Sequence, residues 1–269
     1  MSGFETRFER LELKYLIDEF TADQIRRHIA PYCRRDEHNR EPSGLIFPLT
    51  AERGYSICSL YLDSPGLAFH QAKERGDPER LKLRVRSYEG SPEAMLELKR
   101  RVNDVIDKSR VAVPRAEVEE IVSGTAPLRI GQREARRFVT RFARIAAESG
   151  AEPKLYINYW REAFTSEVDT YARVTFDRQV RAQRTDDWHR VPDPSEWVEF
   201  DEHWRPEFRH KNVVLELKCQ AFVPWWITDL IRAFALKRQS FSKYSIGIHI
   251  TGRAAGAGSA PLRSAKVMQ

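Results

Sequence analysis

The feature that most constrains the fold is a regular alternation of charged and apolar residues in short segments. In ERLKLRVRSYEG, residues 79–90, three cations alternate with three apolar residues: Lys82, Arg84 and Arg86 against Leu81, Leu83 and Val85. Because residues two apart share one face of a strand, the segment predicts a strand with one cationic and one apolar face. Taken alone, it also fits an ordinary sheet with one solvated face.

Five other predicted strands repeat this alternation. The charged faces of the six strands carry, in chain order, Glu12 with Lys14, Arg84 with Arg86, Glu97 with Lys99, Lys108 with Arg110, Arg173 with Asp177, and Glu216 with Lys218. Cations predominate, and small polar residues are scarce. If the apolar faces pack against helices, the charged faces meet one another. The pattern therefore predicts a barrel with a charged lumen.

The remaining periodic segments indicate an α+β protein: an antiparallel β-barrel tunnel with helices packed outside. Nine strands are expected, at 7–17, 55–63, 81–89, 94–102, 107–113, 154–164, 171–181, 213–219 and 241–250. Five helices are expected, at 22–32, 65–75, 114–123, 132–149 and 224–235. Loops are expected at 34–54 and 184–212, where prolines and charges gather. We expect a single domain over 1–250 and a disordered tail over 251–269.

Composition indicates which kind of partner and which cellular compartment to expect. The 269 residues carry a formal net charge of +6, which suggests an anionic partner without naming one. The 3 cysteines include no CxxC pair, so a reducing compartment is expected. The sequence has no apolar run of about 20 residues, the length that spans a bilayer, and no signal peptide. A cytoplasmic location follows as the expectation, and a membrane-associated partner stays open.

Cations crowded in a lumen repel one another and are costly to desolvate unless an anion enters. An extended, multiply charged anion such as polyphosphate or a nucleoside triphosphate suits this arrangement, because guanidinium groups match phosphate oxygens. The glutamates on the same faces are hard oxygen ligands for Mg²⁺ or Mn²⁺. The sequence contains no GxxxxGK[ST], GxGxxG, GxSxG or HExxH motif that would favour another chemistry.

Nine short motifs in order resemble one known family. They are RLELKY (10–15), SLYLDS (59–64), KLRVRSY (82–88), LELKRR (96–101), DKSR (107–110), YINYWREAF (156–164), ARVTFD (172–177), VVLELK (213–218) and SFSKYSIG (240–247). This series resembles the VTC domain, the polyphosphate polymerase domain of vacuolar transporter chaperone proteins, within the CYTH-like triphosphate tunnel metalloenzymes. The resemblance covers about Phe8 to Ile250. The family of triphosphatases typically opens with ExExK, whereas Arg10 here gives RxExK, which favours the VTC branch.

The resemblance implies a role for each matching residue. Six would bind and neutralise the reacting phosphates: Arg84, Arg86, Lys99, Arg161, Arg173 and Lys243. Lys14, Lys108 and Ser242 would assist substrate binding. Lys82 is assigned from the strand pattern instead: it shares the charged face but lies nearest the turn, so we expect it to guide anions toward the tunnel mouth. Glu216 would hold the divalent metal, Mn²⁺ or Mg²⁺, with Glu97 and Glu12 as helpers.

The implied activity is polyphosphate synthesis, in which a growing chain accepts the γ-phosphate of ATP or another nucleoside triphosphate. An inorganic or nucleoside triphosphatase with the same site stays open, as does a non-catalytic polyphosphate-binding module. Nucleic-acid binding is a weaker alternative, because it favours exposed aromatic residues interleaved with basic ones. Trp225 and Trp226 instead begin an apolar helix.

Overall fold

The computed structural model describes residues 10–36, 54–103, 105–125, 131–189, 191–200, 213–220 and 222–254. Its strands are β1 (Arg10–Ile17), β2 (Cys33–Arg35), β3 (Tyr55–Asp63), β4 (Glu79–Tyr88), β5 (Glu93–Val102), β6 (Val105–Pro114), β7 (Glu152–Ser166), β8 (Ala172–Arg184), β9 (Val198–Glu199) and β10 (Val213–Gln220). Its α-helices are α1 (Glu19–Ile29), α2 (Ala68–Arg75), α3 (Val118–Ser123), α4 (Arg133–Ser149), α5 (Trp225–Ala233) and α6 (Lys243–Ala254). Two single-turn 3-10 helices span Arg115–Glu117 and Pro194–Glu196.

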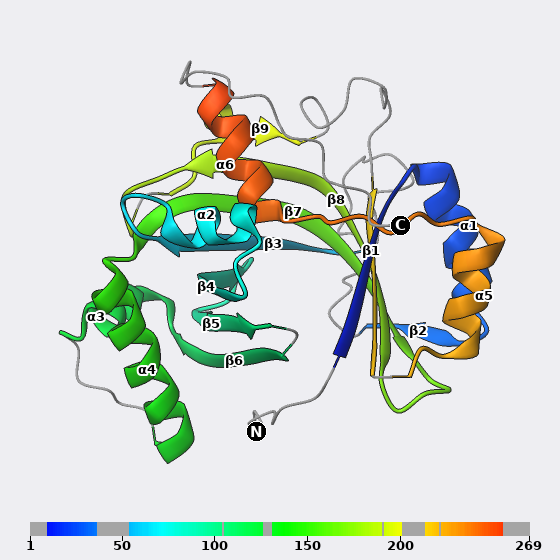
Figure 1. Cartoon of the computed structure of the whole chain (residues 1–269), viewed down its shortest axis with the longest axis horizontal. Coiled ribbons are helices and arrows are strands. Elements are labelled where there is room, and N and C mark those ends of the chain that lie inside the picture. Colours follow the sequence, from blue (N-terminus) through cyan, green and yellow to red (C-terminus); the bar gives the residue numbers. More distant parts are fainter. Residues whose placement is uncertain are drawn as a thin grey trace.

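One antiparallel sheet organises the molecule. Its order is β1-β10-β8-β7-β3-β4-β5-β6, with β2 added to β7 and β9 to β8. Figure 1 shows β7 and β8 arching over β4, β5 and β6. The described strands show no pairing of β1 with β6, so the sheet is a curled half-barrel. Its two ends approach through side chains, since Lys99 Nζ lies 3.5 Å from Glu12 Oε2. The expected α+β fold with helices outside an antiparallel sheet is confirmed, and the sheet that was expected to form a barrel is a curled half-barrel in the described residues.

Helices cover the outer face of the sheet at both ends (Figure 1). At one end, α1 and α5 pack on the apolar faces of β1, β8 and β10, around Phe176, Leu215 and Trp226. At the other end, α3 and α4 pack on β4, β5 and β6, around Leu96 and Phe142. Because the apolar side chains of these strands point outward, the alternating charged side chains point to the inner face. We use "inner face" for the face that carries Arg84, Arg161 and Glu216.

The predicted strand at 241–250 is wrong, because this segment begins the helix α6. Alternating β-branched residues, Ile246, Ile248 and Ile250, favoured a two-residue period. In the structure Ile246 is only partly buried, and the buried residues Tyr244, Ile248 and Thr251 follow the three- and four-residue spacing of a helix.

Tertiary packing explains why this segment is helical. A side chain at Gly247 would place Cβ 2.6 Å from Leu155 Cδ2 and 2.8 Å from Ile157 Cδ1, so the glycine lets α6 lie directly on β7. Tyr244 Oη also donates to the buried Asp63 Oδ2 at 2.7 Å. These contacts outweigh the weak helix propensity of glycine and β-branched residues.

The other elements follow the sequence closely, with shifts at their ends. The expected strand at 55–63 is β3 unchanged, and the expected helix at 132–149 is α4 but for its first residue. The first helix starts at Glu19, earlier than expected, because the Asp18 side chain caps it by accepting from Thr21 N at 2.6 Å. The short strands β2 and β9 lie in or beside predicted loops, and they have no periodicity of their own.

Several expectations fall partly outside the described residues. Most of the predicted loop at 34–54 and part of the predicted loop at 184–212 lie there, as do residues 255–269 of the predicted tail, while α6 continues to Ala254. Within the described ranges, no helix combines the length and apolar character needed to cross a membrane.

Candidate functional site

The strand register brings the predicted cations of β4, β5 and β6 onto the inner face. Arg84 lies opposite Glu97, which in turn lies opposite Arg110. The adjoining row contains lysine on all three strands, namely Lys82, Lys99 and Lys108. Residues directly opposite each other in an antiparallel pair share a face, so these predicted site residues form a continuous charged surface.

The same face continues across β1, β10 and β8. Two rows cross these strands: Lys14, Glu216 and Thr175, and then Glu12, Lys218 and Arg173. Each row mixes acids and bases, unlike the row of three lysines.

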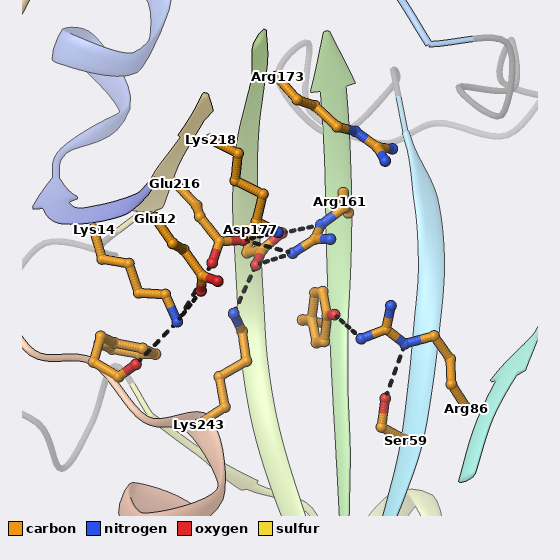
Figure 2. Close-up of polar contacts among 12 residues, drawn as sticks. Glu12, Lys14, Ser59, Arg86, Arg161, Arg173, Asp177, Glu216, Lys218 and Lys243 are labelled. Carbon is orange, nitrogen blue, oxygen red and sulfur yellow. Dashed lines mark hydrogen bonds and ion pairs between the residues drawn. The ribbon is translucent and has the colours of Figure 1, made fainter. Parts of the chain in front are cut away.

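A lysine–glutamate cluster connects β1 and β10 (Figure 2). Lys14 Nζ lies 2.9 Å from Glu12 Oε1 and 3.4 Å from Glu216 Oε1, and it donates to the Phe241 carbonyl at 3.3 Å. Lys218 Nζ lies 2.9 Å from Glu216 Oε2. Burial opposes the charge on Lys14, but Glu216 and Glu12 raise its pKa above the ordinary value. Both glutamates have lowered pKa values despite burial, because the lysines stabilise their ionised forms.

A second cluster joins β7, β8 and α6 (Figure 2). Arg161 donates through Nε to Asp177 Oδ1 at 2.6 Å and through Nη2 to Oδ2 at 2.7 Å. Lys243 Nζ donates to the same Oδ2 at 2.6 Å. Burial opposes ionisation of Asp177, yet Arg161 and Lys243 lower its pKa to about 2. The Tyr159 ring lies under both cations, with its centroid 5.2 Å from Arg161 Cζ and 4.6 Å from Lys243 Nζ. Arg161 Nη2 also lies 3.6 Å from Glu216 Oε2, which connects the two clusters.

A third cluster lies on β3, β4 and β5. Arg84 donates through Nε to Glu97 Oε2 at 2.5 Å and through Nη1 to the Tyr61 hydroxyl at 3.0 Å. Arg86 Nη1 lies 3.7 Å from Glu97 Oε1, and Arg86 Nε lies 3.5 Å from Ser59 Oγ. Burial favours a neutral Glu97, but the two arginines lower its pKa. The buried carboxylate therefore holds two guanidinium groups in fixed orientations.

The positive charges in the row of three lysines are balanced by carboxylates less completely than those in the three clusters. Lys82 Nζ donates to Ser242 Oγ at 3.2 Å, which places the predicted phosphate-binding serine beside a predicted cation. Burial and the neighbouring Lys14 lower the pKa of Lys82 to about 7. Partial burial and Arg84 likewise lower the pKa of Lys108, which lies on the exposed side of the row. An anion would stabilise the charged form of both lysines.

Arg173 lies somewhat apart from the three clusters. Its Nη2 lies 2.8 Å from Asp36 Oδ2 and 3.3 Å from the Tyr55 hydroxyl. Figure 2 shows its guanidinium on the same side of the sheet as Arg161.

Several residues at this site were missed by the sequence prediction. Asp177 and Lys218 share faces with predicted residues, and the alternation already identified them as inward. Only their assignment to the site was missing. Tyr61 and Tyr159 left no charge signal, because aromatic residues in strands are usually core residues. Their hydroxyls nevertheless contact Arg84 and Arg86 at 3.0 and 3.5 Å.

The carboxylates differ in their suitability for a divalent metal. Glu12 and Glu216 share the Lys14 ammonium group, so two hard oxygen donors lie together. Mg²⁺ is often held by one or two carboxylates, with waters and substrate phosphates completing its shell, and this pair fits that pattern. Glu97 is instead engaged by Arg84 and Arg86. In the part of the chain that the structure describes, no group of three or more metal-ligating side chains occurs.

Comparison with known proteins gives the following matches. A model of the VTC domain matches residues 9–251, whereas no curated protein matches the chain. A putative adenylate cyclase from Bacillus halodurans has a similar structure, with a TM-score of 0.49 and 11% identity over 88% of this chain and 96% of that chain. A putative adenylyl cyclase from Hippeastrum, described as having a dominant triphosphatase activity, has a TM-score of 0.45 and 12% identity over 89% and 95%. A protein from Pyrococcus horikoshii OT3 has a TM-score of 0.41 and 10% identity over 92% and 99%.

These structural likenesses are too distant to carry an argument about function. The family model, in contrast, matches nearly all of the residues from β1 to α6. The chain belongs to the VTC domain family.

Proposed function

We propose that the protein is a metal-dependent polyphosphate polymerase that transfers the γ-phosphate of ATP to a growing polyphosphate chain. The observation that carries this proposal is the convergence of cations on one inner face. Arginine–carboxylate units on β4–β5 and β7–β8 lie on the same face as lysines from β1, β10 and α6. Membership of the VTC domain family supports the handling of triphosphate or polyphosphate.

The proposed reaction requires positioning and charge neutralisation rather than a covalent enzyme intermediate. An oxygen of the chain's terminal phosphate forms a bond to the γ-phosphorus. The bond from that phosphorus to the β–γ bridging oxygen breaks, and ADP leaves with the electron pair. Arg84, Arg86 and Arg161 would contact the phosphate oxygens and neutralise the charge that moves between them. They keep their own charge throughout, because arginine does not lose its proton at neutral pH.

The buried carboxylates would orient these arginines. Asp177 accepts two hydrogen bonds from Arg161, and Glu97 accepts from Arg84 and faces Arg86. A guanidinium group fixed in this way loses little freedom when phosphate binds, so more of its interaction energy is available for binding. Lys243, Lys99 and Arg173 would contribute further phosphate contacts, with Lys14, Lys82, Lys108 and Ser242 assisting.

Glu12 and Glu216 would hold the divalent metal, Mn²⁺ or Mg²⁺, beside the phosphates. When bound, the metal would neutralise phosphate charge and polarise the phosphoryl oxygens. The contacts of Glu97 with Arg84 and Arg86 support a role in orienting these arginines rather than in holding the metal. We also propose a cytoplasmic location, supported by three cysteines that are free in the structure.

The test is incubation of the protein with ATP and Mn²⁺, followed by ³¹P NMR and separation of products by length. A polymerase produces phosphates bonded to two other phosphates in a chain, together with one ADP for each phosphate added. Release of orthophosphate alone would contradict the polymerase proposal and indicate a triphosphatase. Absence of turnover with retained polyphosphate binding would indicate a binding module.

A further inference from the structure

An ion pair lies on the outer face of β7 and β8, directly behind the Arg161–Asp177 pair of the inner face. Arg161 and Asp177 are opposite each other in the strand register. The next residue of each strand, Glu162 on β7 and Arg178 on β8, points to the outer face, because strand side chains alternate. There, Arg178 Nη1 donates to Glu162 Oε2 at 3.3 Å. Both faces of the sheet therefore carry an ion pair at the same place.

Helix α1 extends the outer pair into a network. Arg26 donates twice to Glu162, from Nε to Oε1 at 3.0 Å and from Nη2 to Oε2 at 3.1 Å. Arg178 Nε donates to Glu19 Oε1 at 2.7 Å. Both guanidinium groups also lie over the Phe176 ring, whose centroid is 5.8 Å from Arg26 Cζ and 5.6 Å from Arg178 Cζ. We use "outer network" for Glu19, Arg26, Glu162 and Arg178.

The outer network is buried, and its charges are incompletely hydrogen-bonded. Glu162 is 2% exposed and Arg178 is 7% exposed. Among the residues that the structure describes, Arg178 Nη2 and Glu19 Oε2 have no hydrogen-bond partner. A buried ion network seldom stabilises a fold more than apolar side chains of the same volume would, and its best-attested role is to specify one register. These features favour a role in specifying the pairing of β7 and β8.

The register of these two strands requires such specification here. It shifts beside Gln179, which has a positive φ of 50°. A slip of one residue moves every side chain of a strand to the opposite face. A slip of β7 or β8 would turn Arg161 or Asp177 away from the phosphates. The same slip would take Glu162 or Arg178 away from its partners on α1, so the outer network opposes it.

We propose that Glu162 and Arg178 are positioning residues, which fix the register of β7 and β8 together with Arg26 and thereby hold Arg161 and Asp177 toward the phosphate site. The inference rests on the proposed function, because Arg161 is one of the cations assigned there to the phosphates. It adds a dependence that the three inner clusters do not reveal: contacts beneath α1, on the far side of the sheet, determine the geometry of the inner face.

The chain offers a matched control on the same helix. Arg27 follows Arg26, carries the same charge and pairs with the same residue, Asp23, at 2.6 Å for Arg27 Nη2 and 2.7 Å for Arg26 Nη1. The Arg27 side chain is 80% exposed, whereas that of Arg26 is 19% exposed. Replacing Arg27 therefore changes the charge of α1 equally and leaves the contacts of Glu162 in place.

The experiment records two signals, the ¹⁵N NMR resonance of Arg161 Nε and the calorimetric affinity for tripolyphosphate. The resonance, assigned by its loss in Arg161→Lys, reports on the hydrogen bond from Nε to Asp177 Oδ1, which is 2.6 Å long. A purely structural role would lower the denaturation midpoint and leave both signals unchanged in the folded protein. The variants are Glu162→Gln, the apolar triple variant Arg26→Met with Glu162→Leu and Arg178→Met, and the control Arg27→Gln.

We expect the triple variant to fold, because apolar side chains of similar volume replace a buried ion network at little cost. The triple variant and Glu162→Gln should bind tripolyphosphate about tenfold more weakly than wild type, because Arg161 is displaced from the phosphates. Their Arg161 resonance should shift or split. Arg27→Gln should match wild type in both signals. Arg26→Gln, at a partly exposed position, should weaken binding about threefold and serves if the buried variants do not fold.

Either signal unchanged in the folded network variants would overturn the positioning role and leave the outer network purely structural. An equal loss of affinity in Arg27→Gln would also overturn it, because the charge of α1 alone would then explain the effect. If wild type does not bind tripolyphosphate, the proposed function itself fails. The two failures are distinguishable, because the Arg161 resonance reports on the strand register without any ligand.

Discussion

The two halves of β8 face the same interior but contribute different chemistry to it. Before Gln179, the inward side chains are Arg173, Thr175 and Asp177, and after it they are Val180 and Ala182. Gln179 has a positive φ of 50°, and the register with β7 shifts in this region. One extra residue in a strand changes which side chains point inward.

This shift divides the inner face into a charged region and an apolar region. The charged region contains the three clusters described above. The apolar region, with Ile157, Ala182 and Val180, is covered by Ile248 and other residues of α6. The helix then presents Lys243, at its first residue, to Asp177 in the charged region. We therefore expect changes in the apolar region to alter stability and changes in the charged region to alter ligand handling.

The largest expected effect is in the apolar region. Ile157→Ala should lower the free energy of unfolding by about 2–5 kcal/mol, because a fully buried side chain is removed beneath a helix. Denaturant unfolding monitored by circular dichroism measures this change. A loss below about 0.5 kcal/mol, typical of a surface change, would show that α6 does not cover β7 at this point.

In the charged region, Glu216→Gln should reduce turnover of ATP by on the order of 100-fold. The variant keeps the size of the side chain but removes the charge proposed to hold the metal. Steady-state kinetics with Mn²⁺ measures the loss, and calorimetry should still detect tripolyphosphate binding. Full activity in this variant would contradict the assignment of Glu216.

The packing of α6 in the apolar region can also be tested at Gly247. Gly247→Ala should destabilise the protein by about 1–3 kcal/mol, because the added methyl group meets Leu155 and Ile157. Gly252→Ala, in the same helix, is the comparison: its Cβ would meet only the flexible end of Arg184, at 3.1 Å. Equal thermal stability of the two variants would contradict close packing of α6 on β7.

The smallest expected effect is the uptake of protons by Lys82 when phosphate binds. Its pKa of about 7 in the folded protein lies below the value of about 10.4 for an unperturbed lysine. Bound phosphate favours the charged lysine, so binding at about pH 8 should take up protons and should weaken as pH rises further. Calorimetry in buffers of different ionisation enthalpy measures the uptake, and Lys82→Met should reduce it. Proton release on binding would contradict this account.

The same pKa has a consequence for the ligand-free protein. Between about pH 7 and pH 10.4, the folded state holds fewer protons at Lys82 than the unfolded state does, so this group increases stability as pH rises. As pH rises above about 7, the denaturation midpoint of the ligand-free protein should therefore rise, while the affinity of the protein for phosphate falls.

Most of the sheet and the main charged residues could be predicted because alternation reports directly on which face a residue occupies. The alternation predicted the faces of β1, β4, β5 and β10 correctly, because the pattern is unbroken in these strands. It failed at 241–250, where the residues alternate as in a strand, but packing at Gly247 and Tyr244 favours a helix. It also could not place the bulge at Gln179, since no residue type there marks a change of register.

The site was predictable to a similar degree. Charge and alternation identified Arg84 and Glu216, and the family resemblance implied Arg161, but the sequence could not reveal which acid pairs with which base. The pairing of Arg161 with Asp177, and of Glu97 with two arginines, depends on strand neighbours far apart in sequence. Such pairings require the register, which the sequence alone did not determine.

The central claim is that the charged region of the inner face binds a chain of phosphates. A crystal structure of the protein with tripolyphosphate and Mn²⁺ tests it most directly. We predict phosphate groups in contact with Arg84, Arg86, Arg161 and Lys243, with the metal beside Glu12 and Glu216. Phosphates bound only on the outer face, with the Arg161–Asp177 and Arg84–Glu97 pairs free of ligand, would contradict the account.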